Sequence, residues 1–184
     1  MRGFLGSATE LLRTIDFATV IEIGCGPGDL ASSLFLNGRP FNGEYCGFDI
    51  GESEIKAAKK RFPRLEFELG SAYEIPVQDG AAELVVACEV IEHLEFPIDA
   101  IREMARVTQR WVLISVPWEP IWRALNILRG KYMMDFGNTP GHLQHFSRTG
   151  IIRLVEHEFS IREVRYPFPW TMILAEKNDT ICGK

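Results

Sequence analysis

The stretch that decides the fold is VIEIGCGPGDL, residues 20–30, because its character changes midway. It begins as an apolar run typical of a buried strand, and Gly24, Gly26 and Gly28 then follow at two-residue spacing. Glycine removes the side chain where a backbone must turn with a positive φ angle or approach another group closely. A strand, a glycine-rich turn and the start of a helix, in this order, are typical of a site for a nucleotide-like ligand.

The residues after the glycines indicate which kind of nucleotide. The dinucleotide pattern G-x-G-x-x-G is met only in part, because Asp29 stands at its third glycine position, where a carboxylate would repel a pyrophosphate. Asp49 ends the next predicted strand, and a carboxylate there can accept hydrogen bonds from both hydroxyls of a ribose. Ile50 beside it offers an apolar surface for a base. These features predict an adenosine-containing ligand without a diphosphate.

Apolar runs alternate with helical periodicity along most of the chain, which predicts right-handed crossovers and a parallel sheet covered by helices on both faces. A first helix is expected around Ala8–Thr14, and Ser147 is a good N-cap for the last one. Only Pro167–Trp170 joins the last two strands, which is too short for a parallel crossover, so the final strand is predicted to be antiparallel to its neighbour. The predicted strands are Val20–Gly24, Glu44–Ile50, Leu65–Leu69, Leu84–Glu89, Trp111–Val116, Ile161–Tyr166 and Thr171–Ala175.

Composition narrows the class of protein. The chain has 184 residues, 46% of them hydrophobic and 24% charged, which is ordinary for one soluble globular domain. The net charge of −5 argues against a nucleic-acid partner. No apolar run reaches membrane-spanning length, and the four cysteines show no metal-type pairs. We therefore expect a cytoplasmic protein with reduced thiols and no membrane span.

Taken together, the motifs resemble those of the class I S-adenosylmethionine-dependent methyltransferases, in the type 11 small-molecule branch that includes quinone-biosynthesis enzymes. The resemblance runs from about Thr19 to Lys177. It implies one Rossmann-like domain over residues 1–184, with a seven-stranded, mostly parallel sheet of order 3-2-1-4-5-7-6 whose last strand is antiparallel. The motifs that carry it are Glu22–Gly28, Asp49, Gly70–Ala72, Leu84–Leu94 and Gly141–Ser147.

The resemblance also implies the cofactor, S-adenosyl-L-methionine, and the product, S-adenosyl-L-homocysteine. By this analogy the glycines pack against the methionyl portion, Glu22 steers its ammonium group and Asp49 holds the ribose. Ser71 departs from the family pattern, which has an acidic residue at this position, although its hydroxyl can still accept from the adenine amino group. The cofactor-binding residues expected in this way are Glu22, Gly24, Cys25, Gly26, Gly28, Asp49, Ile50, Ser71, Ala72, Glu89 and Val90.

A hydroxyl acceptor needs a base near neutral pH, which histidine supplies most readily. His93 follows the fourth predicted strand, where it is either a base or a hydrogen-bonding residue of the turn. His142 and His145 lie three residues apart, and either is a candidate base, whereas His157 is late in a helix and reads as structural. No carboxylate accompanies His142 and His145 at ligand spacing, so the sequence predicts no metal site.

Residues 118–146 interrupt the strand–helix alternation with glycines, prolines, aromatic residues and methionines, which favours a lid over an apolar acceptor site. The core would then comprise residues 19–117 and 147–177. Cys88 follows Ala87 and no Pro-Pro-aromatic turn follows the fourth strand, which excludes cytosine-C5 and exocyclic-amine chemistry. A small or lipid-like acceptor with an oxygen, nitrogen or carbon nucleophile remains.

Two other functions stay open at this stage. One is a non-catalytic S-adenosylmethionine-binding module that acts as a partner or sensor. The other is a nicotinamide-dependent oxidoreductase, against which Asp29 and the antiparallel final strand both count. The sequence leaves the oligomeric state undecided.

Overall fold

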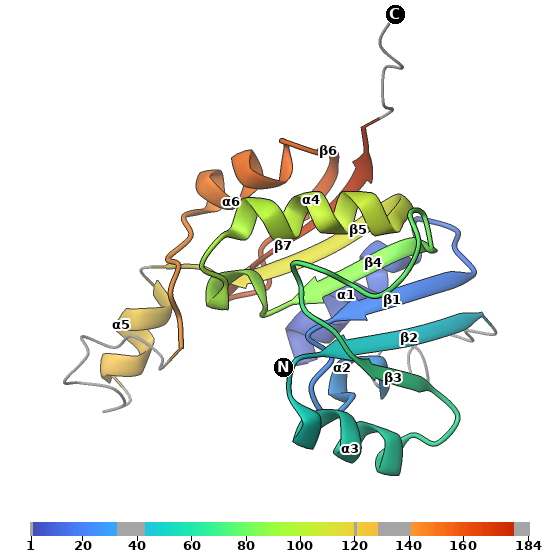
Figure 1. Cartoon of the computed structure of the whole chain (residues 1–184). Coiled ribbons are helices and arrows are strands. Elements are labelled where there is room, and N and C mark those ends of the chain that lie inside the picture. Colours follow the sequence, from blue (N-terminus) through green and yellow to red (C-terminus); the bar gives the residue numbers. More distant parts are fainter. Residues whose placement is uncertain (1, 33–42, 120, 129–140, 179–184) are drawn as a thin grey trace, which may run out of the picture.

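The computed structural model describes residues 2–32, 43–119, 121–128 and 141–178. Their strands form one seven-stranded sheet in the order β3-β2-β1-β4-β5-β7-β6 (Figure 1). β7 is antiparallel to both of its neighbours, and the other pairs are parallel, so the predicted fold class is confirmed. The strands are β1 (Thr19–Ile23), β2 (Glu44–Asp49), β3 (Glu66–Leu69), β4 (Ala82–Cys88), β5 (Thr108–Pro117), β6 (Phe159–Arg165) and β7 (Trp170–Lys177).

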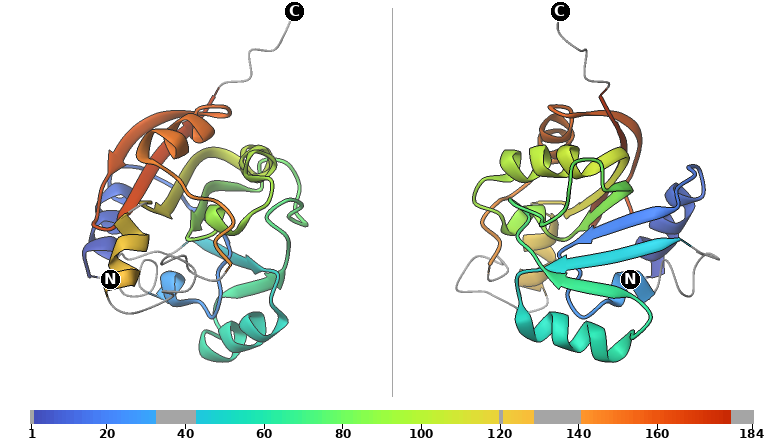
Figure 2. Two further views of the ribbon diagram at one scale, coloured as in Figure 1. Left: turned by 90° about the vertical axis from the view of Figure 1, so that its left-hand side faces the viewer. Right: turned by 45° about the vertical axis from the view of Figure 1, so that its right-hand side comes forward.

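Helices cover both faces of this sheet, with α4 and α6 in front of it and α1 behind it in the view of Figure 1; Figure 2 shows the same layers from two other sides. The turn after β4 is a short 3-10 helix, η2 (Ile91–His93). The α-helices are α1 (Arg2–Leu12), α2 (Asp29–Ala31), α3 (Glu52–Arg61), α4 (Pro97–Val107), α5 (Ile121–Leu128) and α6 (Arg148–Val155).

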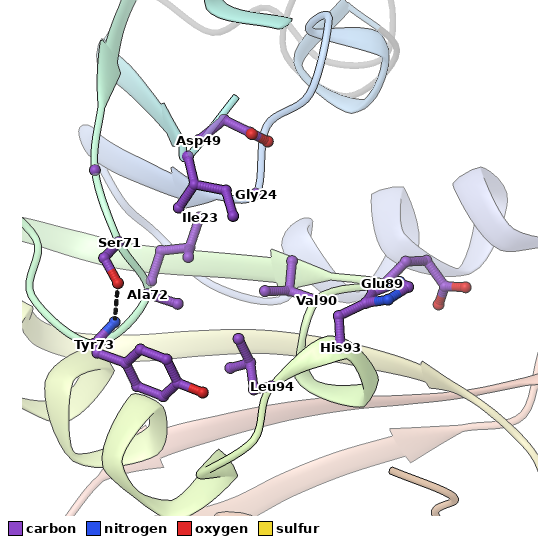
Figure 3. A pocket seen from close by; sticks show the side chains of 12 residues that line it. Ile23, Gly24, Asp49, Ser71, Ala72, Tyr73, Glu89, Val90, His93 and Leu94 are labelled. Carbon is purple, nitrogen blue, oxygen red and sulfur yellow. Dashed lines mark hydrogen bonds between the residues drawn. The ribbon is translucent and has the colours of Figure 1, made fainter. Parts of the chain in front are cut away.

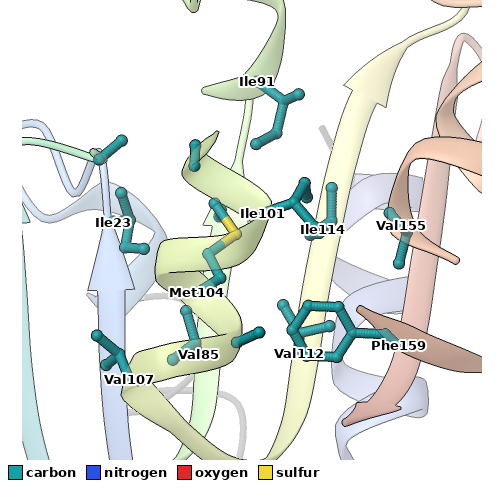
Figure 4. Close-up of a cluster of buried hydrophobic side chains, with 14 of the residues drawn as sticks. Ile23, Val85, Ile91, Ile101, Met104, Val107, Val112, Ile114, Val155 and Phe159 are labelled. Carbon is teal, nitrogen blue, oxygen red and sulfur yellow. The ribbon is translucent and has the colours of Figure 1, made fainter. Parts of the chain in front are cut away.

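The strands place alternate side chains in two separate cores, as the two-residue period of a strand requires. Val85 of β4 packs with Ile101 and Met104 of α4 and with Val155 of α6 (Figure 4). Its neighbour Leu84 belongs to the core on the opposite face, which α1 and α3 close. A central strand that is apolar on both faces is the signature of a parallel sheet buried between helices.

Two helix ends test the sequence predictions directly. The side chain of Ser147 accepts a hydrogen bond from the Gly150 N–H at 3.0 Å, which confirms the predicted N-cap of α6. The first helix begins well before the predicted Ala8, because Phe4 extends the buried stripe of Ala8 and Leu11 by one turn. Phe4 also lies edge-on to the Trp170 ring, with 5.3 Å between the ring centroids.

The predicted lid is described only at its two ends. α5 follows β5, and its Trp122 ring lies 5.6 Å from the Trp170 ring between centroids. Residues 120 and 129–140 lie outside the described part of the chain, so the lid stays a prediction. Among the described residues, no helix combines the length and apolarity needed to cross a membrane.

Candidate cofactor site

A cavity of about 300 Å³ opens at the carboxyl ends of β1, β2 and β4 (Figure 3). The strand order reverses between β1 and β4, and open α/β sheets bind their ligands in the crevice at this switch point. Of the predicted cofactor residues, Gly24, Asp49, Ile50, Ser71, Ala72, Glu89 and Val90 line the cavity, whereas Glu22, Cys25, Gly26 and Gly28 lie outside its lining.

The three glycines after β1 all have positive φ angles, of 68°, 50° and 82°, but their surroundings differ. A Cβ atom on Gly24 would lie 2.4 Å from the Val90 side chain, at the cavity wall. A Cβ atom on Gly28 would meet the Phe62 ring at 2.8 Å, so this glycine lets the loop pack against the aromatic residue that follows α3. At Gly26 a Cβ atom would meet nothing within 4 Å. Only Gly24 therefore combines tight packing with a position on the cavity.

Asp49 is fixed at the end of β2 by two backbone amides. Its Oδ2 accepts a hydrogen bond from the Gly26 N–H at 2.9 Å, and its Oδ1 accepts one from the Gly51 N–H at 2.8 Å. A carboxylate offers about four lone-pair sites, so each oxygen keeps the capacity to accept a further hydrogen bond from a ligand. The side chain thus joins the glycine loop to the start of α3 and still presents acceptors to the cavity.

Glu22 lies beneath the glycine loop and is only 2% exposed. Its carboxyl group accepts a hydrogen bond from the Tyr45 hydroxyl at 2.6 Å. Burial is the main cause that raises the pKa of Glu22 to about 8, and the negative charge of Asp49 adds to it, whereas the Tyr45 hydrogen bond opposes it. The predicted interaction of Glu22 with an ammonium group stays a prediction, since this side chain does not reach the cavity surface.

The far side of the cavity is largely apolar. Ile50 is 81% exposed and Ala72 is buried, so the two offer a surface on which a flat ring can lie. The Ser71 hydroxyl accepts a hydrogen bond from the Tyr73 N–H at 3.2 Å (Figure 3). Sequence reasoning missed Tyr73 and Leu94 as lining residues, because both come from turns whose course depends on the tertiary structure.

Glu89 closes the cavity at the end of β4 with a left-handed backbone, at a φ angle of 60°. The Trp170 Nε1–H donates to its carboxylate at 2.8 Å, and the Ser115 hydroxyl does so at 3.3 Å. Burial raises the pKa of Glu89 to about 7 despite these two hydrogen bonds. A non-glycine residue in this region of backbone space is strained, and such residues cluster at functional sites.

Comparison with known proteins identifies the family. Residues 21–113, which run from β1 into β5, match the family described as Methyltransferase domain. The chain belongs to the class I S-adenosylmethionine-dependent methyltransferases. Ubiquinone biosynthesis O-methyltransferase of Bordetella parapertussis is 32% identical over 120 residues, 60% of this chain and 47% of that protein. Ajmaline N-methyltransferase of Rauvolfia serpentina is 30% identical over 103 residues, 53% of this chain and 34% of that protein.

The chain thus spans only about a third to a half of the length of these curated relatives. Among solved structures, magnesium protoporphyrin IX methyltransferase from Synechocystis PCC 6803, determined with bound S-adenosylhomocysteine, superposes with a TM-score of 0.71. The match covers 95% of this chain and 82% of that one at 18% identity, which shows a common fold.

The three candidate bases of this methyltransferase, His93, His142 and His145, differ in whether they line the cavity. His93 lines it, and the His93 Nδ1 lies 2.9 Å from the Gly141 carbonyl oxygen. His142 is buried outside the lining, and its ring centroid lies 4.8 Å from that of His93. Burial lowers the pKa of His142 to about 4, and the charges of His93 and His145 add to the shift. His145 is exposed and outside the lining, so only His93 meets the cavity directly.

The prediction that the histidines bind no metal stays a prediction. That prediction rested on the lack of a carboxylate at ligand spacing along the chain, but the fold brings Glu92 and Glu119 to His142 from two other segments. Sequence reasoning missed both carboxylates as site residues. The available signal was that Glu92 directly precedes His93 within the motif after β4.

We expect Gly24→Ala to destabilise the folded chain by about 2 kcal/mol, because an alanine there must keep a left-handed backbone and displace Val90. Chemical denaturation measures the loss. In the double variant Gly24→Ala/Val90→Ala, the clash between the new Cβ atom and the Val90 side chain is removed. The loss of stability relative to Val90→Ala alone should therefore shrink to the cost of the left-handed backbone at position 24. Equal costs in both backgrounds would show that the Val90 contact is unimportant.

Proposed function

We propose that this chain binds S-adenosylmethionine in the β1–β4 cavity and transfers its methyl group to a nucleophile of a small or lipid-like molecule. The observation that carries this proposal is the Asp49 carboxylate, which two amides orient at the cavity while leaving lone pairs for a ribose diol. The family of the chain supports the same cofactor.

The residues around the cavity fit that cofactor and disfavour a dinucleotide. Asp29 stands in the first turn of α2, where a pyrophosphate would need the helix amides, and it pairs with Arg61 of α3. The apolar surface of Ile50 and Ala72 suits an adenine ring, and the Ser71 hydroxyl lies at its edge. The site therefore suits a nucleoside without phosphates.

S-adenosylmethionine supplies an activated methyl group on a positively charged sulfur. The protein then has to hold the acceptor in line with that group and exclude water. β5 ends at the same edge of the sheet as the cavity, and we propose that residues 118–146, which follow it in sequence, cover the acceptor. His93, which lines the cavity, is the candidate base with the most direct access to it.

The class of acceptor follows from charge and from the relatives. The net charge of −5 disfavours a nucleic acid. One relative is named as an O-methyltransferase of ubiquinone biosynthesis and another as an N-methyltransferase, so the relatives support a small or lipid-like acceptor without selecting its atom. We propose a cytoplasmic enzyme whose nucleophile is oxygen, nitrogen or carbon.

We expect S-adenosylhomocysteine and S-adenosylmethionine to raise the thermal unfolding midpoint of the purified chain, whereas NAD leaves it unchanged. A ligand that binds only the folded state stabilises it by about 2.7 kcal/mol at a hundredfold excess over its Kd. Differential scanning fluorimetry measures the three shifts side by side. A shift with NAD alone would assign the site to a dinucleotide and overturn the proposal.

Binding alone does not distinguish an enzyme from a non-catalytic module. A methyl-radiolabelled cofactor incubated with a cell extract fractionated by size should label a low-molecular-mass or lipid fraction. Binding without label in any fraction would favour the module, and label in nucleic acid would contradict the proposed acceptor class.

A further inference from the structure

We propose that Glu92, His93, His142 and Glu119 form a binding site for a divalent first-row metal ion at the wall of the cofactor cavity. The inference rests on the proposed function only in its second part, which is that the ion binds a hydroxyl oxygen of the acceptor and so makes the reaction an O-methylation.

Three of these side chains already converge. One ligand atom each from Glu92, His93 and His142 lies within 4.8 Å of the others in the described part of the chain. Glu119 extends the group, because its Oε1 lies 3.8 Å from the His142 Nδ1. A set of two imidazoles and two carboxylates is a typical ligand set for Mn²⁺, Fe²⁺ or Zn²⁺.

Glu92 is the second, independent sign of a missing ligand. Its side chain is 1% exposed, and beyond its own backbone amide neither carboxylate oxygen has a hydrogen-bond partner among the described residues. Burial of a carboxylate without a partner costs several kcal/mol, so such groups are normally paired or bound to a metal. A cation between Glu92 and the two histidines would supply the partner.

His93 is oriented as metal-bound histidines are. Its Nδ1 faces the Gly141 carbonyl oxygen at 2.9 Å, and a carbonyl can only accept, so Nδ1 carries the proton. The Nε2 lone pair is then available to an ion. In most metal sites, the ring nitrogen of a histidine that does not bind the metal donates a hydrogen bond to a carboxylate, a backbone carbonyl or water, and this hydrogen bond fixes the tautomer.

Backbone hydrogen bonds hold the contributing segments together. The N–H groups of Leu143 and Gln144 both donate to the Glu92 carbonyl oxygen at 2.9 Å, which fastens the segment carrying His142 to η2. The Glu119 N–H donates to the Phe146 carbonyl oxygen at 3.2 Å, which fastens the segment after β5 to the same place. Main-chain hydrogen bonds thus hold together η2, the segment after β5 and the segment that carries His142. The side chains of these segments can therefore converge on one point.

The position of this site defines what it can do. His93 lines the cofactor cavity together with Glu89 and Val90, so an ion held by His93 would lie beside a methyl donor bound in that cavity. A cation that keeps open coordination positions takes a hydroxyl oxygen as ligand and lowers its pKa. The oxygen lone pair then forms the bond to the methyl carbon, the carbon–sulfur electron pair stays on sulfur, and the proton leaves to solvent. An acceptor with two neighbouring hydroxyls would bind such an ion best.

Equilibrium dialysis of the chelator-treated chain against Mn²⁺ or Zn²⁺ tests the site. We expect about one ion per chain at micromolar concentration, and an affinity at least tenfold lower in Glu92→Gln and in His142→Gln. Glu95→Gln removes an exposed carboxylate three residues from Glu92 and should bind as the parent does. No bound ion in the parent, or equal binding by Glu92→Gln, overturns the metal site.

The same samples separate this inference from the proposed function. S-adenosylhomocysteine should still stabilise Glu92→Gln, which shows that this variant is folded; loss of that binding in the parent would instead refute the proposed function. With Mn²⁺ bound, catechol used as a probe should displace water from the ion and reduce water-proton relaxation. Unchanged relaxation at saturating catechol would refute the hydroxyl-binding role while leaving the ion site in place.

Discussion

The Asp49→Ala variant is expected to bind S-adenosylhomocysteine on the order of 100-fold more weakly than the parent chain, a loss of about 2.7 kcal/mol. Two effects contribute. The ribose loses charged hydrogen-bond acceptors, each of which contributes about 1.5–3 kcal/mol. The amides of Gly26 and Gly51 also lose the carboxylate that holds the glycine loop against the start of α3. Isothermal titration calorimetry measures the affinity.

Two controls separate these effects. Asp49→Asn keeps one acceptor oxygen and the shape of the side chain, so it should retain part of the loop anchoring and bind with intermediate affinity. A 2′,3′-dideoxy analogue of S-adenosylhomocysteine cannot donate to Asp49. It should therefore bind the parent weakly and bind Asp49→Ala about as well as the complete ligand does. If Asp49→Ala still discriminates strongly between the two ligands, the carboxylate does not bind the ribose.

The fold was predictable because its signals are local. The apolar runs, the glycine turn after β1 and the short connection Pro167–Trp170 each act within a few residues, and together they predict a largely parallel sheet with an antiparallel final strand. The strand order followed from the resemblance to the methyltransferase family. Asp49 was predictable for the same reason, since the end of a strand beside the glycine turn has a fixed place in a parallel sheet. The N-terminal extension of α1 was missed because Phe4 packs against Trp170, a residue that is far away in the sequence.

The cluster around Glu92 was not predictable from spacing. Glu92, Glu119 and His142 belong to three segments that meet only after the sheet has formed and their backbones have paired. Motif reasoning compares residues within one segment, so it found His142 and His145 and no carboxylate. The need for glycine at position 28 was also not predictable from spacing, because the Phe62 ring that excludes a Cβ atom there lies at the end of α3.

Glu22→Gln is expected to leave stability nearly unchanged near pH 4.5 and to raise the free energy of unfolding by roughly 4 kcal/mol at pH 8. The pKa of Glu22 rises from its usual 4.5 to about 8 on folding, chiefly because the side chain is buried. Below pH 4.5 both the folded and the unfolded chain carry the proton, and the neutral carboxyl imposes no penalty. Between pH 4.5 and 8 the unfolded chain loses the proton first, so the parent loses stability, and this loss is complete above pH 8.

Glutamine stays neutral throughout and can still accept the Tyr45 hydrogen bond, so the variant escapes this loss. Urea denaturation of both chains at pH 4.5, 6 and 8 measures the difference. Other buried groups that titrate in this range, such as Glu89 and Glu92, are present in both chains and cancel in the comparison. Tyr45→Phe is the matched control, because it removes the hydrogen bond that favours the ionised carboxylate and should deepen the loss at pH 8. A stability difference between Glu22→Gln and parent that is independent of pH would mean that the pKa of Glu22 is the same in the folded and the unfolded chain, which would contradict the predicted rise.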